Sequence, residues 1–316
     1  MLSEYAILPG VFDPASYVHP SVFEVCLRNM KEPLLQGAII RDLREGGWSL
    51  SIVQRETQWH PHLKELWKHL KMRLRPTGAA ARGVPENDSG WCIEALASHG
   101  LEPLNGIIAP ETVKNTSIAR NAIVASVEKL ASADWWGDRT ISVRIVRNMQ
   151  EYRNKLRLVL ARANSVMFID PHLDPANSNY KEFFKLLLDT RRPDVQPLIQ
   201  IHRKIWIDPR ERAGPCDTLD QSKTYWREKF TKQLAPSIHT NQKVEVFLWD
   251  NFHDRYLISD LVGILVPNGF DTTTDPKSIT TWTRLSRGVR DDVQREFEPT
   301  NKRLHDCKAS FEIQGK

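Results

Sequence analysis

The sequence predicts an α/β protein with a mixed sheet flanked by helices, preceded by an N-terminal α+β module. From about residue 140 onward, short and fully apolar segments of strand length alternate with amphipathic helical patterns. This alternation is typical of parallel strands covered on both faces. The last three apolar segments lie too close together for helical crossovers, so we expect them to pair antiparallel. We therefore expect two domains, a module at residues 1–115 and a larger domain at residues 116–316.

The N-terminal module combines an extended start with three helical patterns. These segments cover residues 5–9, 20–45, 62–75 and 91–101. The Pro-Thr-Gly run that follows the segment 62–75 ends that helix, and residues 82–90 read as a polar loop. We expect this module to contact a protein partner, and its sequence assigns it no other role.

Two features of this module allow a functional and a structural interpretation. His60 and His62 flank Pro61, but no nearby carboxylate or cysteine completes a metal site, and Pro61 suits the first turn of a helix. The helix that follows carries basic residues beside tryptophans, which suits either a nucleic-acid-binding face or an ordinary solvated helix. The residues of this pattern are Lys64, Lys68, Lys71, Arg73, Arg75, Trp59 and Trp67.

The larger domain begins with a helical pattern at residues 116–133 and continues as strands and helices. Strands are expected at residues 140–146, 165–169, 198–201, 244–249, 256–259 and 262–266. Helices are expected at residues 149–163, 180–189 and 223–234, with a long polar excursion at residues 208–222.

Composition excludes several classes of protein. The 316 residues contain 44 Lys plus Arg and 39 Asp plus Glu, a net charge of +5 that is compatible with a polyanionic partner without requiring one. The four cysteines show neither paired nor zinc-finger spacing. No apolar run is long enough to span a bilayer and no signal sequence is evident, so we expect a cytoplasmic protein without membrane insertion.

His253 and Arg255 are the most informative pair in the chain. They alternate along the strand expected there and would share one of its faces. An imidazole can attack phosphorus or donate a proton, and a guanidinium binds phosphate through two hydrogen bonds, so the pair predicts an anion site. Asp170 and His172 follow another expected strand, at the end where ligands commonly bind α/β sheets; alternatively, His172 is only a turn residue.

The segment His253-x-Arg255-x-x-x-x-Asp260, followed by Gly263 and Asn268, resembles the motif of the phospholipase D superfamily, with arginine where that family has lysine. The order of expected elements is also similar to one half-repeat of that fold. The resemblance implies that His253 is the nucleophile on phosphorus and that Arg255 and Asp260 are catalytic with it. It implies no metal and no cofactor. Because only one full motif is present, it also implies a homodimer that brings two His253 side chains together.

Gly269-Phe270-Asp271 resembles a divergent branch of the same superfamily. This branch includes the C-terminal domain of MIT-domain proteins, which binds acidic phospholipid, and bacterial proteins tied to defence. The resemblance implies that Asn268, Asp271, His172 and Asp170 bind phosphate or support the site.

Three functions therefore remain open. The first is a metal-independent nuclease, of the kind found in prokaryotic antiviral defence. The second is a catalytically inactive module that binds phosphate or nucleic acid, and the third is an adaptor subunit of a larger complex. Nucleic acid is favoured over lipid because no amphipathic membrane helix is evident.

Two structural alternatives accompany these hypotheses. In the first, His253 is a histidine of an ordinary hairpin, and Arg255 is ion-paired to Asp254 or Asp260. A second His-x-Lys pattern starts at His202 but reaches Asp208 one residue too early, so we interpret it as a chance match that adds basic residues, together with Arg210 and Arg212, to a surface.

Overall fold

The computed structural model describes residues 1–54, 59–77, 84–116, 120–137, 139–190, 196–205, 218–301 and 304–315. The α/β fold class is confirmed. The chain divides into two compact units, Leu2–Thr140 and Ile141–Lys316, with Met1 assigned to the second. The boundary predicted after residue 115 is therefore wrong. Residues 124–137 belong to the first unit because, for example, the rings of Trp135 and Trp136 pack within 5.6 Å and 5.5 Å of the Tyr5 ring.

The N-terminal unit contains a five-stranded sheet in which every strand pair is parallel. Its strands are β1 (Ser3–Ile7), β2 (Ala38–Asp42), β3 (Leu74–Pro76), β4 (Gly106–Ala109) and β5 (Val124–Ser126), in the order β3-β2-β1-β4-β5. The module is thus α/β and not α+β as predicted. The helix predicted at residues 116–133 is also wrong, because β5 and the 3₁₀ helix η6 (Val127–Ser132) occupy most of the described part of this segment.

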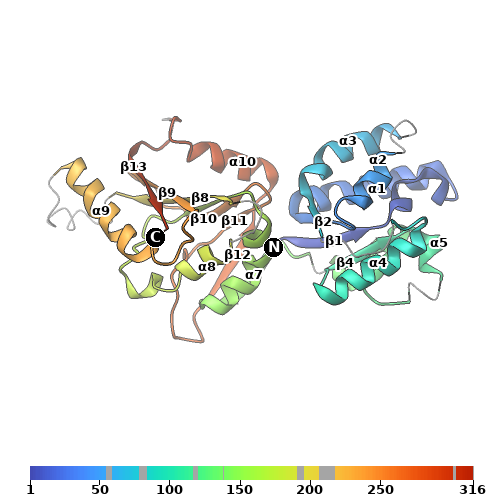
Figure 1. The fold of residues 1–316 in the computed structure, drawn as a ribbon, viewed down its shortest axis with the longest axis horizontal. Coiled ribbons are helices and arrows are strands. Elements are labelled where there is room, and N and C mark those ends of the chain that lie inside the picture. The colour runs from blue at the N-terminus through green and yellow to red at the C-terminus, as the bar shows by residue number, and fades with distance from the viewer. Residues whose placement is uncertain are drawn as a thin grey trace. The chain divides into compact units, whose positions relative to one another are not determined.

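Helices cover both faces of this sheet (Figure 1). They are α1 (Pro20–Gly37), α2 (Gly47–Val53), α3 (Pro61–Leu70), α4 (Asp88–Leu101), α5 (Glu111–Lys114) and α6 (Asp134–Gly137). Figure 1 shows α1, α2 and α3 on one side of the sheet and α4 and α5 on the other. This arrangement is the doubly wound architecture expected of parallel strands joined by helices.

The C-terminal unit is built on an eight-stranded mixed sheet, which confirms the predicted sheet type. Its strands are β6 (Ser142–Val146), β7 (Ser165–Ile169), β8 (Leu198–Lys204), β9 (Lys243–Trp249), β10 (Tyr256–Ser259), β11 (Gly263–Leu265), β12 (Ile279–Arg284) and β13 (Cys307–Gln314). The order is β13-β9-β8-β7-β10-β11-β12-β6. Strands β7, β8 and β9 are parallel, and the other neighbouring pairs are antiparallel.

Helices pack on opposite faces of this sheet (Figure 1). They are α7 (Met149–Arg162), α8 (Phe184–Leu188), α9 (Leu219–Leu234) and α10 (Arg287–Glu296). Val293 of α10 joins an apolar cluster with Met167 and Ile169 of β7. Phe168, which alternates with them, packs on Phe183 beside α8 instead. The core of the unit therefore lies on both faces of β7, which explains why this strand is apolar at every central position.

Among the described residues, no helix is both long and apolar enough to cross a membrane.

Candidate anion-binding site

Five segments of the C-terminal unit meet at one edge of its sheet. The parallel strands β7, β8 and β9 end at this edge. Because β10 is antiparallel to β7 and pairs Tyr256 with Ile169, the residues before β10 also lie there. The end of β11 returns to the same place, since Leu265 pairs with Tyr256. The edge thus collects residues that are distant in the sequence, as the carboxyl ends of strands do in other α/β sheets.

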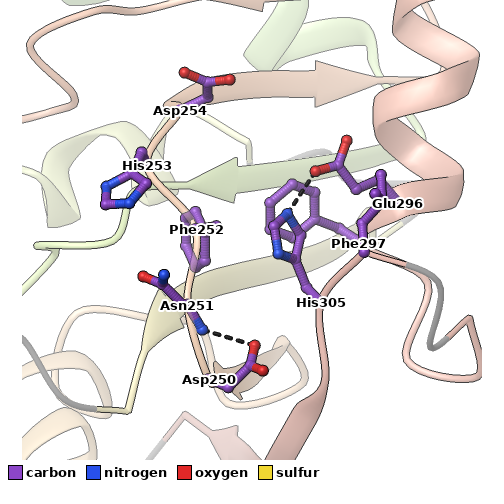
Figure 2. Close-up of a pocket in the computed structure, with 9 residues that line it drawn as sticks. Asp250, Asn251, Phe252, His253, Asp254, Glu296, Phe297 and His305 are labelled. Carbon is purple, nitrogen blue, oxygen red and sulfur yellow. Dashed lines mark hydrogen bonds and ion pairs between the residues drawn. The ribbon is translucent and has the colours of Figure 1, made fainter.

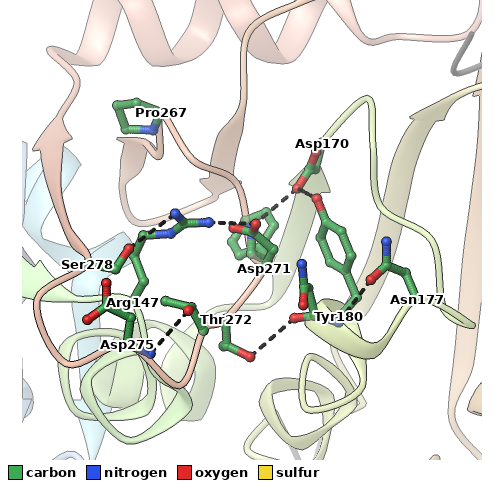
Figure 3. Close-up of polar contacts among 12 residues, drawn as sticks. Arg147, Asp170, Asn177, Tyr180, Pro267, Asp271, Thr272, Asp275 and Ser278 are labelled. Atoms are coloured by element: carbon green, nitrogen blue, oxygen red, sulfur yellow. Dashed lines mark hydrogen bonds and ion pairs between the residues drawn. The ribbon is translucent and has the colours of Figure 1, made fainter.

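Asp170 is the buried centre of this edge. It is fully buried, and its Oδ1 accepts a hydrogen bond from the backbone N–H of His172 at 3.0 Å. Its Oδ2 accepts from the Tyr180 hydroxyl at 3.0 Å and from the Phe270 N–H at 3.2 Å (Figure 3). Burial raises the pKa of the Asp170 carboxyl, and these N–H groups together with the charge of Arg255 oppose the rise. The carboxyl therefore joins the segments after β7 and β11.

Gly269 allows this close approach. Its φ of +69° lies in the left-handed region that favours glycine, and a Cβ atom placed there would lie 2.0 Å from Asp170 Oδ2. Glycine is therefore required at this turn for two independent reasons. The same Cβ would also lie 3.1 Å from Cδ of Arg255, so the turn, the carboxyl and the guanidinium form one packed group.

Arg255 lies directly beside Asp170. Its Nε is 3.5 Å from Asp170 Oδ1, and its NH1 group donates to the carbonyl of Pro267 at 2.8 Å. These contacts fix the direction of the guanidinium, whose side chain is still 26% exposed. An arginine held in this way can present its remaining N–H groups to an anion.

A lysine and two histidines lie near Arg255. His172 follows Asp170, and Lys204 ends β8, where its N–H donates to the carbonyl of Pro171 at 3.4 Å. Burial lowers the pKa of His172, and the charges of Arg255, Lys204, Arg203 and His253 lower it further. We call His172, Lys204, His253 and Arg255 the basic edge cluster. Arg255 and Lys204 supply its permanent positive charges, and Asp170 is the carboxylate beside Arg255.

The structure changes the predicted role of Asp260. His253 and Arg255 precede β10 and do not lie on it, whereas Asp260 follows it. Asp260 is therefore at the opposite end of the strand, where its carboxylate accepts from the backbone N–H and the side-chain amide of Asn164 at 2.9 Å and 3.0 Å. The prediction that His253 and Arg255 alternate along a strand is wrong, and Asp260 is not brought to their side.

Asp271 and Asn268 lie beside the cluster with different environments. Asp271 is ion-paired to Arg147, with NH2 and Oδ2 2.6 Å apart, and its carbonyl accepts from the Tyr152 hydroxyl at 2.9 Å. Figure 3 shows Arg147 between Asp271 and Ser278. Asn268 is exposed in the turn after β11. Asp271 therefore supports the turn, and Asn268 is accessible from solvent.

A pocket of 480 Å³ opens on the other side of His253 (Figure 2). Its polar lining includes three acidic residues, Asp250, Asp254 and Glu296. Glu296 Oε1 is 2.5 Å from Nε2 of His305, which also lines the pocket. His253 thus lies at the border between an acidic pocket and the basic edge cluster.

The residues of the His-x-Lys pattern that starts at His202 have different surroundings. His202 is fully buried, accepts a hydrogen bond from Trp249 Nε1 at 3.1 Å and stacks on Phe247. Burial lowers its pKa to about 3. Arg203 stacks over the ring of Trp226 in α9. Asp208, Arg210 and Arg212 lie outside the described residues, and so does most of the predicted polar excursion.

Lys204 is the site residue that sequence reasoning did not single out. It belongs to a pattern interpreted as a chance match, and the strand predicted at residues 198–201 is shorter than β8. The usable signal is its place at the end of a parallel strand, level with the residues that follow β7.

The candidates of the N-terminal unit have structural roles where they are described. His60 caps α3 by accepting from the N–H of His62, and its Nε2 is 3.1 Å from Glu24 Oε1. Arg73 is buried and donates to the carbonyl of Ala38, so it is not part of an exposed basic face. In the described portion of the chain, no three His, Cys, Asp or Glu side chains gather as they would around a metal ion.

Comparisons with known proteins show no family for this chain. No family model matches the sequence, and no curated protein is similar to it. Among solved structures, TrmBL2, an archaeal chromatin protein whose structure shows a novel mode of DNA binding, is similar at 14% sequence identity with a TM-score of 0.25. The match covers 51% of this chain and 52% of that chain. At this TM-score the similarity supports no conclusion about function.

Proposed function

We propose that the C-terminal unit is a phospholipase-D-like domain that binds phosphate groups of nucleic acid at the basic edge cluster. The observation that carries the proposal is the convergence of Arg255, Lys204, His172 and His253 beside the carboxylate of Asp170. Besides burial, the charges of Arg255 and Lys204 lower the pKa of His172, and the charge of Arg255 lowers the pKa of Lys204. A bound anion would relieve this repulsion between like charges.

The chemistry of the cluster suits a phosphate oxygen. Arg255 is oriented by Asp170 and by the Pro267 carbonyl, and a guanidinium presents paired donors that match phosphate geometry. The protein has a net charge of +5, which favours approach of a polyanion. As part of this proposal, we place the protein in the cytoplasm and assign the N-terminal unit to contact with a protein partner.

Binding of short single- and double-stranded DNA and RNA tests this function. We expect Arg255→Ala to weaken binding by about tenfold or more, because an oriented charge-assisted contact to phosphate is lost. Lys243→Ala is the matched control, since it removes a positive charge from an exposed position on β9. Equal affinities for the parent and the Arg255→Ala protein would contradict the proposal.

Metal-independent cleavage by His253, in prokaryotic antiviral defence, is a second candidate function. His253 favours it because this imidazole is exposed at the border of an open pocket, where it can reach a phosphorus atom. In this mechanism His253 attacks phosphorus and forms a phosphohistidine, and the leaving oxygen takes a proton from a second imidazole. A homodimer that pairs two His253 side chains is one source of that second imidazole.

Nuclease assays in EDTA separate cleavage from binding. We expect the His253→Ala protein to lose metal-independent cutting and to retain most of its affinity, because Arg255 and Lys204 remain. Cutting that persists in this variant would show that His253 is not the nucleophile. Binding without any cutting by the parent would leave the phosphate-binding function alone.

A further inference from the structure

Lys204 is an unusual member of the basic edge cluster. It is only 8% exposed, although lysine is rarely buried without a partner. Among the residues that the structure describes, its ammonium has no hydrogen bond or ion pair, and the nearby charge of Arg255 repels it. Partial burial and the charge of Arg255 both lower the pKa of Lys204, so an anion beside its ammonium would stabilise the charged form.

The members of the cluster lie at different depths. His253 is exposed at the rim, the Arg255 side chain is 26% exposed, and Lys204 is 8% exposed at the end of β8. The carboxylate of Asp170 lies 3.5 Å from Nε of Arg255, and no described carboxylate is ion-paired to Lys204. A ligand that neutralises Lys204 must therefore reach the least exposed cation of the cluster.

On the basis of the proposed function, we infer that the cluster recognises a terminal phosphate monoester of a nucleic acid strand, with Lys204 as its innermost ligand. An internal phosphodiester has a sugar on both sides and only two free oxygens, so it is held away from a recessed ammonium. A terminal phosphate has three free oxygens and a charge near −2. It can contact Lys204 and Arg255 together while the strand leaves the site past His253.

Matched oligonucleotides test the inference. We would measure the affinity of the full chain for one single-stranded sequence with a 5′-phosphate, with a 3′-phosphate or with hydroxyl groups at both ends. We expect one phosphorylated end to bind about tenfold or more tightly than the hydroxyl form, because the second negative charge meets a buried cation. Inorganic phosphate should compete with that end.

Two variants assign the preference to Lys204. Lys204→Met keeps the aliphatic stem and removes the ammonium, so we expect the preference to fall to about twofold or less. Lys243→Met makes the same change at an exposed position on β9 and should retain the preference. The comparison of the three oligonucleotide ends uses the parent protein, so it tests the inference even if Lys204→Met does not fold.

The outcomes distinguish this inference from the proposed function. Binding that depends on Arg255 but is the same for all three ends would overturn the terminal-phosphate inference and leave nucleic-acid binding in place. A preference for a phosphorylated end that survives in Lys204→Met would overturn the role of Lys204. If inorganic phosphate and a nucleoside monophosphate bind through Lys204 but no oligonucleotide binds, the cluster does not recognise a nucleic acid strand. That result would overturn both the proposed function and the terminal-phosphate inference.

Discussion

At the scale of single residues, Asp170 organises the candidate site. Its two oxygens accept from His172, Phe270 and Tyr180, and its charge faces Arg255. Two of the donors follow β7 and the third follows β11, so one buried carboxyl fixes the position of the guanidinium relative to both segments. A buried carboxylate is costly unless its hydrogen bonds are satisfied, and here they are.

The turn at Gly269 gives a prediction for stability. Gly269→Ala forces a side chain into the left-handed region and against Asp170, so we expect the C-terminal unit to lose about 2–4 kcal/mol of unfolding free energy. Gly288→Ala in α10 is the control, because a Cβ there meets nothing within 4 Å, and its effect should lie between zero and a gain of about 1 kcal/mol. Urea unfolding measures both. Equal stability of the two variants would contradict the packed arrangement at Gly269.

Asp260 is predicted to stabilise the fold and not to act on the ligand. Asp260→Ala removes two hydrogen bonds to Asn164, so we expect a loss of about 1–2 kcal/mol in unfolding free energy. Because Asp260 lies at the other end of β10, affinity for nucleic acid should stay within about twofold of the parent. If Asp260→Ala instead loses affinity for nucleic acid at unchanged stability, the result would support the catalytic role that the phospholipase D motif implies for Asp260.

His202 gives a prediction for pH dependence. Burial lowers its folded-state pKa to about 3, below the value of about 6.5 in the unfolded chain, so the unfolded state binds the proton more readily. The stability that this neutral imidazole contributes is present above about pH 6.5 and is lost as the pH falls toward 3, by up to about 1.4 kcal/mol per pH unit. Urea unfolding from pH 7 to pH 5 should show this slope in the parent.

His202→Phe is the variant that isolates this effect. It keeps an aromatic ring against Phe247 and cannot be protonated. The variant can differ from the parent in stability at pH 7, because Trp249 Nε1 loses its acceptor. Its stability should nevertheless fall less steeply with pH. Identical slopes in the two proteins would show that His202 does not titrate on unfolding.

At the scale of elements, β1 and β2 are joined by a buried ion pair. Arg41 NH2 lies 2.9 Å from Glu4 Oε2, both side chains are fully buried, and Arg41 NH1 also donates to the carbonyls of Ser98 and Glu102 at the end of α4. The pair therefore connects two strands of the N-terminal sheet to the helix that covers them. The sequence offered no sign of it, because β2 was not predicted as a strand.

Removing one partner of this pair should be more harmful than removing both. Arg41→Met leaves Glu4 buried without its counter-ion, and we expect a loss of about 3–5 kcal/mol in the N-terminal unit. The double variant Glu4→Leu with Arg41→Met should recover part of that loss. Chemical unfolding of the three proteins measures the coupling. A double variant less stable than Arg41→Met would contradict it.

At the scale of the whole molecule, the division after Thr140 makes a prediction about fragments. A fragment of residues 2–140 retains β5 and the two tryptophans that pack on Tyr5, and we expect it to unfold cooperatively. A fragment of residues 1–115 lacks them and should be degraded faster in limited proteolysis. Equal resistance of the two fragments to proteolysis would support the boundary predicted after residue 115.

Elements whose pattern is local could be predicted from the sequence alone. It placed β7 and β10 correctly and predicted α7 to within one residue of its end, because apolar runs and helical periodicity depend on neighbours in the chain. It did not predict β5 as a strand, and it offered nothing for β13. The first has three residues, and both depend on pairing with distant strands.

Which residues of the motif meet depends on the topology of the sheet. The sequence identified His253, Arg255, Asp170 and His172 as candidates, but only the antiparallel register of β10 with β7 brings them to one edge. The same register carries Asp260 to the opposite end, and the parallel pairing of β8 adds Lys204 to the cluster. Side-chain spacing along one strand is a local property, whereas the convergence of strand ends depends on the order of strands in the sheet.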